Sequence, residues 1–595
     1  MSPKLATVFG FPSKHDVLHL RNPKTITDPM ASPDGPVNST DSYNRQGPRP
    51  KTHSHMYGSG QKPAPKITIR PKKKPKAILL DSAAVLTPED VVAVARYGAR
   101  VNISSSTLRN VKEIWNGIQE NVRNGKAYYG ITRAVGDNKD IPLTPEQAVK
   151  FSLDLIHSHA RGVGDTYFSV PEVRAAMLVL AKSLSEAHSC IRPSTLKLLV
   201  AMLNKGITPC VREKGSIGSS GDLIPLAQIA RALLGEGKVY DHRGVKMRAK
   251  AALEKAGLEP VTLQAGEGLT LINGTMMMTG LAALNVYDAS RLFKTSLIAA
   301  GFITEILYGD RNAYAPILFA VRKHKEHAIV AADMLALTEG SELLKETQRH
   351  TQAPYSLRSI PQVMGTTATW MARINEDVLA ELNSCTGNPI FYWEGEGKNR
   401  TLQYRSGAGF HGQPIAIAMD FLKIIMSELG DLSFERVNRL LNPYLNEGLN
   451  SFLVPVADGR SGCMIDAYAL LAEHIENIAR LFPVSALSKP VSNNQEDNNS
   501  MGTIAARWAR DVLRDAEWVV AIELIDTAIA ADLRFTNQDT RLSDIDWYGA
   551  YAAVRHVSKK LTEDRDLEPD MQRLVDMIRD DNFVPIVEKF LSLKY

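Results

Sequence analysis

The chain has 595 residues, of which 44% are hydrophobic and 23% charged, the balance of a globular protein with a sizeable core. The net charge of +5 comes from one basic cluster near the N-terminus, without whose six charges it would be −1, so a nucleic-acid enzyme is not indicated. Four cysteines without any C-x-x-C spacing argue against a disulfide framework or a zinc site.

Residues 1–78 are rich in proline, serine, asparagine, histidine and lysine and show no hydrophobic periodicity. Such a segment buries too little apolar surface to fold, so we predict a disordered, basic N-terminal extension. It carries the basic cluster, which consists of Lys66, Arg70, Lys72, Lys73, Lys74 and Lys76. The N-terminus has no apolar signal core, and no apolar run reaches membrane length. We expect a cytoplasmic protein without nucleic-acid or membrane partners, and one folded domain over residues 79–595.

Helical signals dominate the folded part. Thr87-Pro88-Glu89-Asp90 combines a capping residue, a proline and first-turn acids, which predicts a helix start. Residues 415–441 are apolar almost all round, as in a helix buried in a bundle. Residues 464–482 and 504–533 carry apolar side chains at helical spacing, whereas residues 393–398 are predicted to form a loop. The predicted fold class is mainly α, with a central bundle of long helices.

The run Gly215–Leu226 carries the strongest chemical signal. Ser220 has a hydroxyl that can leave as water, and Gly221 has no Cβ to prevent its amide nitrogen from reaching the carbonyl of Ser219. Loss of two waters would convert Ser219-Ser220-Gly221 into 4-methylideneimidazol-5-one, an electrophile made from the backbone. A glycine-rich turn that cradles an anion is the alternative. A G-x-S-x-G nucleophile elbow fails because Asp222 occupies the second glycine position.

Further motifs accompany this run along the chain. They are residues 129–132, 271–275, 352–358, 407–412 and 494–497. In this order they resemble the aromatic amino acid ammonia-lyases and aminomutases, with histidine ammonia-lyases closest in motif. The resemblance implies the helical fold of that family and a homotetramer with composite active sites. It also implies methylideneimidazolone formed autocatalytically from the Ser219-Ser220-Gly221 triad, with no external cofactor and no metal.

The resemblance also assigns roles to individual residues. Tyr129 would remove the β-proton of the substrate, and Arg358 would hold the substrate carboxylate in a bidentate contact. The catalytic set that it implies is Tyr129, Ser219, Ser220, Gly221, Tyr355 and Glu476. The substrate-binding set that it implies is Ser158, His159, Asn273, Gln352, Arg358, Phe410 and Gln495.

Two places in the sequence bear on the substrate. Ser158-His159 stands where phenylalanine- and tyrosine-specific relatives place Phe-Leu or His-Leu and where histidine ammonia-lyases place Ser-His. His159 can exchange a hydrogen bond with a substrate imidazole, and a carboxylate at Glu476 can hold the ring or take the amine proton. A core histidine without contact to substrate is the alternative for His159. We expect elimination of ammonia from an aromatic L-amino acid, histidine first and then phenylalanine or tyrosine, to give the trans-α,β-unsaturated acid.

Two other functions stay open at this level. An aromatic amino acid 2,3-aminomutase uses the same electrophile and returns ammonia to the β-carbon. A repurposed, non-catalytic scaffold is suggested by departures from the family motifs at Ser219, Arg133, Ala353 and Gly409. Ser219 replaces the usual alanine, and Arg133 places a charge on the loop that carries Tyr129.

Overall fold

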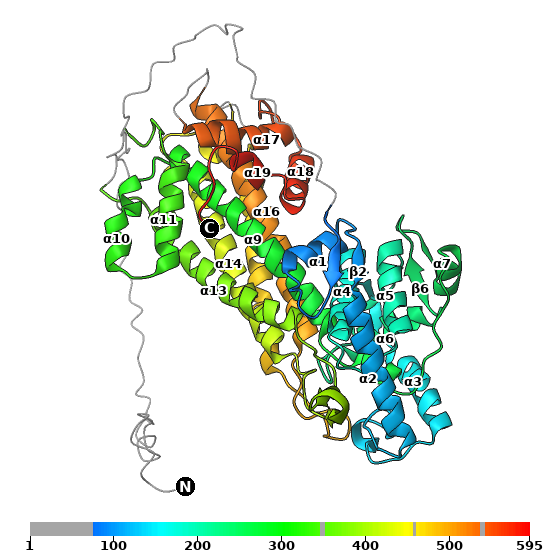
Figure 1. Cartoon of the computed structure of the whole chain (residues 1–595). Coiled ribbons are helices and arrows are strands. Elements are labelled where there is room, and N and C mark those ends of the chain that lie inside the picture. The colour runs from blue at the N-terminus through cyan, green and yellow to red at the C-terminus, as the bar shows by residue number, and fades with distance from the viewer. Residues whose placement is uncertain (1–74, 346–350, 456–459, 536–541) are drawn as a thin grey trace, which may run out of the picture. The chain divides into compact units, whose positions relative to one another are not determined.

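The structure is a computed structural model that describes residues 75–345, 351–455, 460–535 and 542–595 (Figure 1). The chain divides into two units, Met1–Gly60 and Gln61–Tyr595. The first unit and most of the predicted extension, residues 1–74, lie outside the described residues. Within the second unit, helices dominate and only short strands occur, which confirms the predicted mainly α class.

Long helices form a central bundle, as the sequence predicts (Figure 1). They are α9 (Met276–Ile306), α13 (Ile360–Leu382), α14 (Gln413–Leu441) and α16 (Gly502–Arg534). α14 packs against the other three, which explains why its sequence is apolar almost all round. The helix predicted over 464–482 is α15 (Met464–Ala479), which packs on α14 and α16.

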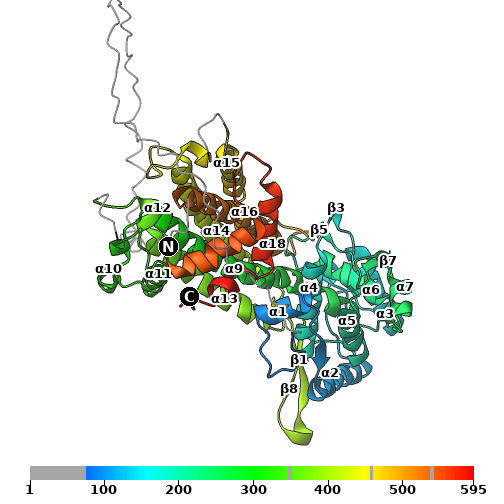
Figure 2. The ribbon, with the colours of Figure 1, turned by 90° about the horizontal axis from the view of Figure 1, so that it is seen from above.

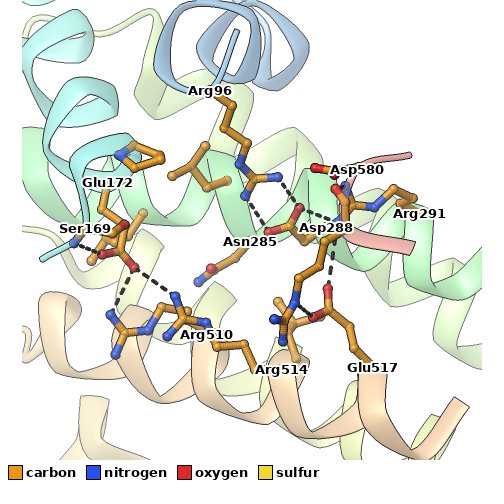
Figure 3. A pocket seen from close by; sticks show the side chains of 15 residues that line it. Arg96, Ser169, Glu172, Asn285, Asp288, Arg291, Arg510, Arg514, Glu517 and Asp580 are labelled. Carbon is orange, nitrogen blue, oxygen red and sulfur yellow. Dashed lines mark hydrogen bonds and ion pairs between the residues drawn. The ribbon is translucent and has the colours of Figure 1, made fainter. Parts of the chain in front are cut away.

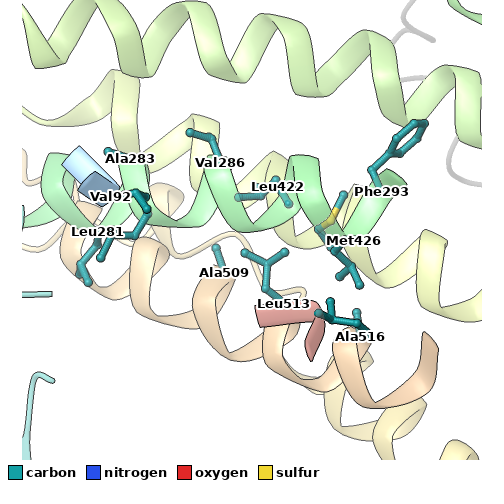
Figure 4. Packing of buried hydrophobic residues seen from close by; sticks show 14 of the residues in the cluster. Val92, Leu281, Ala283, Val286, Phe293, Leu422, Met426, Ala509, Leu513 and Ala516 are labelled. Atoms are coloured by element: carbon teal, nitrogen blue, oxygen red, sulfur yellow. The ribbon is translucent and has the colours of Figure 1, made fainter. Parts of the chain in front are cut away.

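Buried aliphatic side chains fill the space between these helices (Figure 4). Leu422 and Met426 of α14, Leu513 of α16 and Val286 of α9 belong to one continuous core. Each such side chain contributes about 1.5–3 kcal/mol when it is fully buried. The core therefore fixes the starting residues of α9 and α16 relative to one another.

The N-terminal helices pack beside the bundle. They are α1 (Pro88–Ala95), α2 (Ser105–Arg123), α3 (Pro145–His159), α4 (Val170–Ser185), α5 (Pro193–Lys205), α6 (Leu223–Leu233), α7 (Ala249–Lys255) and α8 (Glu267–Ile272). Thr87 caps α1 through a reciprocal contact with Asp90, which confirms the predicted helix start. α4 lies so close to α9 that a Cβ on Gly280 would stand 2.7 Å from the backbone nitrogen of Ala176. Glycine at this crossing lets the two helices approach.

The strands form four small sheets. β1 (Ile78–Leu80) pairs with β2 (Val101–Ile103) in parallel, and β3 (Val163–Tyr167) pairs with β5 (Arg212–Lys214). β4 (Thr208–Pro209), β6 (Lys238–Tyr240) and β7 (Lys246–Arg248) form the third sheet, and β8 (Ile390–Glu394) pairs with β9 (Thr401–Arg405) in the fourth.

The loop predicted over 393–398 is wrong at its start, because Trp393 and Glu394 belong to β8. The β8–β9 hairpin lies beside α2 (Figure 2). Phe391 and Leu402 are buried in a small apolar cluster with Tyr128. This packing, which a reading of local turn residues does not capture, extends the strand into the predicted loop.

Shorter helices complete the described chain: α10 (Pro316–Val321), α11 (Lys325–Leu337), α12 (Tyr355–Arg358), α17 (Ala552–Val557), α18 (Glu568–Arg579) and α19 (Val584–Val587). None of the helices in the described ranges combines the length and the apolar content that a membrane crossing requires.

A charged cavity of about 390 Å³ lies among α1, α4, α9, α16 and α18 (Figure 3). Arg96 donates two hydrogen bonds of 2.6 Å to Asp288, and Arg510 donates one of 2.9 Å to Glu172. The arginines that line this cavity thus form ion pairs with carboxylates of the same chain. We interpret it as a junction that ties the helices together, and none of the predicted site residues lines it.

Candidate active site

The Ser219-Ser220-Gly221 triad lies in a tight turn that precedes α6. Ser220 and Gly221 both have positive φ, +49° and +76°, which is strained for serine and easy for glycine. A Cβ on Gly221 would lie 2.2 Å from the carbonyl oxygen of Gly274. Only glycine fits at this position, so the turn brings an unhindered amide to the place where the predicted cyclisation needs one.

Asp222, the residue after the triad, holds the turn in place through hydrogen bonds. Its buried carboxylate accepts hydrogen bonds from Ser216 Oγ (2.9 Å), from the backbone nitrogen of Met278 (2.8 Å) and from Thr503 Oγ1. Burial raises the pKa of Asp222, and these hydrogen bonds oppose that rise. Met278 lies in the first turn of α9 and Thr503 in the first turn of α16, so the Asp222 side chain ties the triad to two helices of the bundle.

A cavity of about 300 Å³ opens above the triad. Its polar lining includes Tyr129, His159, Ser220, Asn273 and Glu496, and leucine and isoleucine side chains from α3, α6 and α8 supply apolar walls. Most of the remaining wall comes from residues 135–138 and 492–493. Three predicted residues from distant parts of the sequence, Tyr129, His159 and Asn273, thus share one cavity with the triad.

Asn273 contacts the triad directly. Its Nδ2 donates a 3.0 Å hydrogen bond to the backbone carbonyl of Ser220. The side chain is almost fully buried, and its Oδ1 has no hydrogen-bond partner. An unpaired, buried acceptor beside a cavity is suited to receive a hydrogen bond from a bound ligand.

Tyr129 is the candidate base among the residues that line the cavity. Its oxygen accepts a 3.2 Å hydrogen bond from the backbone nitrogen of Gly136. Burial raises the pKa of Tyr129, the hydrogen bond from Gly136 opposes that rise, and the nearby carboxylate of Glu496 adds to it. The neighbouring Tyr128 does not line the cavity; its hydroxyl accepts a hydrogen bond from Asn121, and its ring packs against Phe391. Tyr129 is therefore the tyrosine of this loop that is placed to act on a ligand.

His159 ends α3 at the rim of the cavity. Its Nδ1 lies 2.8 Å from the carbonyl oxygen of Leu155 and 2.9 Å from Ser158 Oγ. A carbonyl oxygen can only accept, so we assign the ring proton to Nδ1, and Nε2 of the neutral ring is then an acceptor. Ser158 does not line the cavity, and its hydroxyl contacts His159 Nδ1 and the carbonyl of Leu155.

The predicted Gln495 and its neighbour Glu496 differ in position. Glu496 lines the cavity and accepts a hydrogen bond from Ser219 Oγ, a contact between a triad residue and a carboxylate that the sequence motifs do not predict. Gln495 is exposed, and its Oε1 accepts a 2.9 Å hydrogen bond from Lys139 Nζ. Gln495 thus connects the loop that carries Tyr129 with the loop that carries Glu496.

The departure at Arg133 leaves the cavity unobstructed. Its guanidinium donates a 2.7 Å hydrogen bond to the carbonyl of Asp140, within the same loop. Arg133 is not part of the cavity lining. The charge therefore braces its own loop.

Besides Ser158 and Gln495, five more of the predicted catalytic and substrate-binding residues do not line the cavity of the single chain: Gln352, Tyr355, Arg358, Phe410 and Glu476. The Tyr355 side chain is 73% exposed, and the Arg358 guanidinium lies over its ring at 4.7 Å. Arg358 Nε is buried without a hydrogen-bond partner, and Glu476 is exposed beside Arg480. One chain therefore brings the triad, Tyr129 and His159 together. Arg358, which is predicted to bind the substrate carboxylate, lies outside the cavity of that chain.

The helical fold and the serine-glycine triad beside a cavity are the features by which the sequence resembles the aromatic amino acid ammonia-lyases. The family model "Aromatic amino acid lyase" matches residues 86–556. The chain belongs to the aromatic amino acid lyase family and is a carbon–nitrogen lyase.

Relatives and solved structures agree with this assignment. The chain is 40% identical to a histidine ammonia-lyase of Symbiobacterium thermophilum, with 86% of this chain and 98% of that protein covered. It matches a tyrosine aminomutase structure from Streptomyces globisporus with a TM-score of 0.81 and 32% identity, covering 87% of this chain and 100% of that one. It matches histidine ammonia-lyase from Trypanosoma cruzi with a TM-score of 0.78 and 30% identity, covering 87% and 96%.

Proposed function

We propose that this protein is a histidine ammonia-lyase, which converts L-histidine into ammonia and the trans-α,β-unsaturated acid. The observation that carries the proposal is His159, which lines the cavity beside the triad and has its Nδ1 held by a backbone carbonyl. An acceptor Nε2 is matched to the N–H of a substrate imidazole, whereas a benzene ring would leave it unpaired. Relatives named histidine ammonia-lyase, 37–40% identical over nearly their whole length, support the same substrate.

The triad residues fit the prosthetic group that the family forms. Positive φ at Ser220 and the absence of room for a Cβ at Gly221 favour ring closure at this turn. Asn273 holds the Ser220 carbonyl, and Asp222 holds the base of the turn. When formed, the group supplies an electrophile that makes the substrate amine easier to expel and its β-proton easier to remove.

The other cavity residues would move the proton and orient the substrate. Tyr129 takes the β-proton, the C–N bond breaks, a C=C bond forms, and the protonated amine of the substrate leaves as ammonia. The phenol of Tyr129 needs stabilisation of its anion, because burial raises its pKa in the single chain. Cations that enter the site from a second copy of the chain, such as Arg358, would lower it.

A composite site in a homotetramer explains the placement of the remaining residues. A stripe of large apolar side chains at helical spacing is exposed along α15 and just beyond it: Ile465, Tyr468, Leu471, Ile475, Ile478 and Phe482. Such a face is typical of a subunit interface. Glu476 lies on the same helix, and Tyr355 is 73% exposed. We infer that a second copy brings Gln352, Tyr355, Arg358, Phe410 or Glu476 to the cavity.

A second candidate is an aromatic amino acid 2,3-aminomutase, because a tyrosine aminomutase is among the solved structures with the same fold. It differs in its product, since ammonia returns to the β-carbon. A non-catalytic scaffold is the third candidate, and it predicts an unmodified triad.

Two measurements test the proposal together. The purified protein is assayed with L-histidine, L-phenylalanine and L-tyrosine by the ultraviolet absorbance of the unsaturated products, and its intact mass is measured. We expect turnover of histidine in preference to the other two, and a mass about 36 Da below that of the sequence, equal to two waters. Ser220→Ala should restore the missing mass and abolish turnover. A preference for phenylalanine or tyrosine would contradict the histidine assignment, and an unmodified wild-type mass would contradict the mechanism.

A further inference from the structure

A second cluster of reactive side chains lies between α15 and α16 and takes no part in the proposed reaction. Cys463 stands immediately before α15, Asp466 lies in its first turn, and Asp526 lies within α16. One ligand atom from each, a sulfur and two carboxylate oxygens, lies within 4.8 Å of the others. The sequence predicts no metal site, because Asp466 and Asp526 are sixty positions apart and no cysteine pair announces one.

Burial makes this cluster costly unless something compensates it. Cys463 and Asp526 are fully buried, and Asp466 is 4% exposed. Neither oxygen of Asp526 receives a hydrogen bond from outside the cluster, and Oδ2 of Asp466 is likewise unpaired. Among the described residues, no lysine or arginine forms an ion pair with either aspartate. Two adjacent buried carboxyl groups without a cation or donors oppose folding if they are ionised.

We propose that Cys463, Asp466 and Asp526 bind one divalent cation of the zinc type. A thiolate favours a borderline-soft cation, and carboxylates are common companions of sulfur in such sites. Zinc–sulfur and zinc–oxygen bonds of about 2.3 and 2.0–2.2 Å place tetrahedral ligands roughly 3–4 Å apart, which small side-chain movements reach from the observed cluster. The three side chains supply three of the four ligands of a tetrahedral site. Binding releases to solvent the protons that the thiol and carboxyl groups hold.

The cation would act as a clamp between two elements. Cys463 N donates a 2.8 Å hydrogen bond to the carbonyl of Phe452, so the same point also fixes the segment before α15. α15 carries the exposed apolar stripe, and α16 starts next to the triad. A metal between them stabilises the position of α15 on the bundle, independently of whether the protein acts on histidine.

A second pair of buried carboxyl groups provides an internal control. Glu305 and Asp546 are both fully buried, and burial raises the pKa of each. The neighbouring Glu305 raises the pKa of Asp546 further, whereas the hydrogen bond with Asp546 lowers that of Glu305. This pair has no cysteine beside it, and Glu305 accepts a 2.9 Å hydrogen bond from the backbone nitrogen of Ser543. Asp546→Asn should therefore change no metal binding, although it alters a buried acid pair of the same kind.

The experiment measures metal binding by the full-length protein. Wild type, Cys463→Ser, Asp526→Asn, Asp546→Asn and Cys210→Ser are stripped with chelator, exposed to Zn²⁺, freed of excess and analysed by elemental mass spectrometry. Cys210, which lies outside the cluster, controls for binding by any thiol. We expect about one zinc per chain in wild type and both controls, and at least about tenfold weaker retention in the two cluster variants.

Co²⁺ gives a direct readout of a metal–thiolate bond, and its first result comes from the wild-type protein alone. Co²⁺ loaded into wild type should produce the near-ultraviolet charge-transfer band of a cobalt–thiolate bond, and Cys463→Ser should lose that band while Cys210→Ser keeps it. Absence of the band in wild type, or zinc retention that is the same in wild type and Asp526→Asn, would overturn the proposal. Either result would indicate that the two aspartates share a proton instead.

Discussion

Replacing His159 with leucine gives the sharpest test of how the cavity selects its substrate. His159 Nδ1 is held at 2.8 Å from the Leu155 carbonyl, so the ring presents Nε2 in a fixed orientation. One hydrogen bond of this kind, buried by the substrate, contributes about 1–3 kcal/mol. His159→Leu should therefore lower kcat/KM for L-histidine by roughly 5- to 150-fold. It should leave kcat/KM for L-phenylalanine unchanged or higher, because leucine offers an apolar wall.

His157 provides a matched control on the same helix. Its Nε2 lies 3.0 Å from Glu236, it is not part of the cavity lining, and His157→Leu makes the same chemical change outside the cavity. The two variants are compared by steady-state kinetics with both substrates. If His159→Leu keeps the wild-type preference, or if His157→Leu shifts it equally, then His159 is a structural histidine and the reasoning about specificity fails.

Three further predictions address the base, the core and the assembly. Tyr129→Phe should reduce kcat for histidine by at least about 100-fold with little change in binding, while Tyr128→Phe should reduce it far less; the reverse order would reassign the base. Asp546→Asn should raise the unfolding temperature more at pH 8 than at pH 5. Burial raises the pKa of the Asp546 carboxyl in the folded state above its unfolded-state value of about 3.9. Wild-type stability therefore falls as the pH rises from the unfolded-state pKa through the folded-state pKa, and the variant does not undergo this loss. A rise in unfolding temperature that occurs only at low pH would contradict this expected pH dependence. Ile475→Asp should convert a tetramer into smaller species by light scattering, and a wild-type protein that is already monomeric and fully active would contradict the composite site.

Local sequence signals predicted the parts of the fold that depend on near neighbours. Thr87 and Asp90 form the predicted helix cap because both partners lie within one turn. The apolar run at 415–441 predicted a buried helix because its pattern is continuous. The triad was recognisable because its chemistry needs three consecutive residues.

Contacts between distant segments were not predictable in this way. Asp222 stood in the recognised run, but its role depends on α9 and α16, which begin more than fifty positions later. The motif at 494–497 contains both Gln495 and Glu496, and it does not show which of these two adjacent side chains faces Ser219. The cluster of Cys463, Asp466 and Asp526 forms only when α15 packs on α16. Tertiary packing determines each of these three contacts, and local sequence patterns carry no information about it.

The most direct test of the central claim is the product that the purified protein makes from L-histidine. Nuclear magnetic resonance of the reaction mixture, with ammonia measured in parallel, follows both fragments of the cleaved bond. The account predicts one ammonia for each trans-α,β-unsaturated acid formed, with no β-amino acid accumulating. Accumulation of β-histidine, or no consumption of histidine by a protein whose triad has lost two waters, would contradict it.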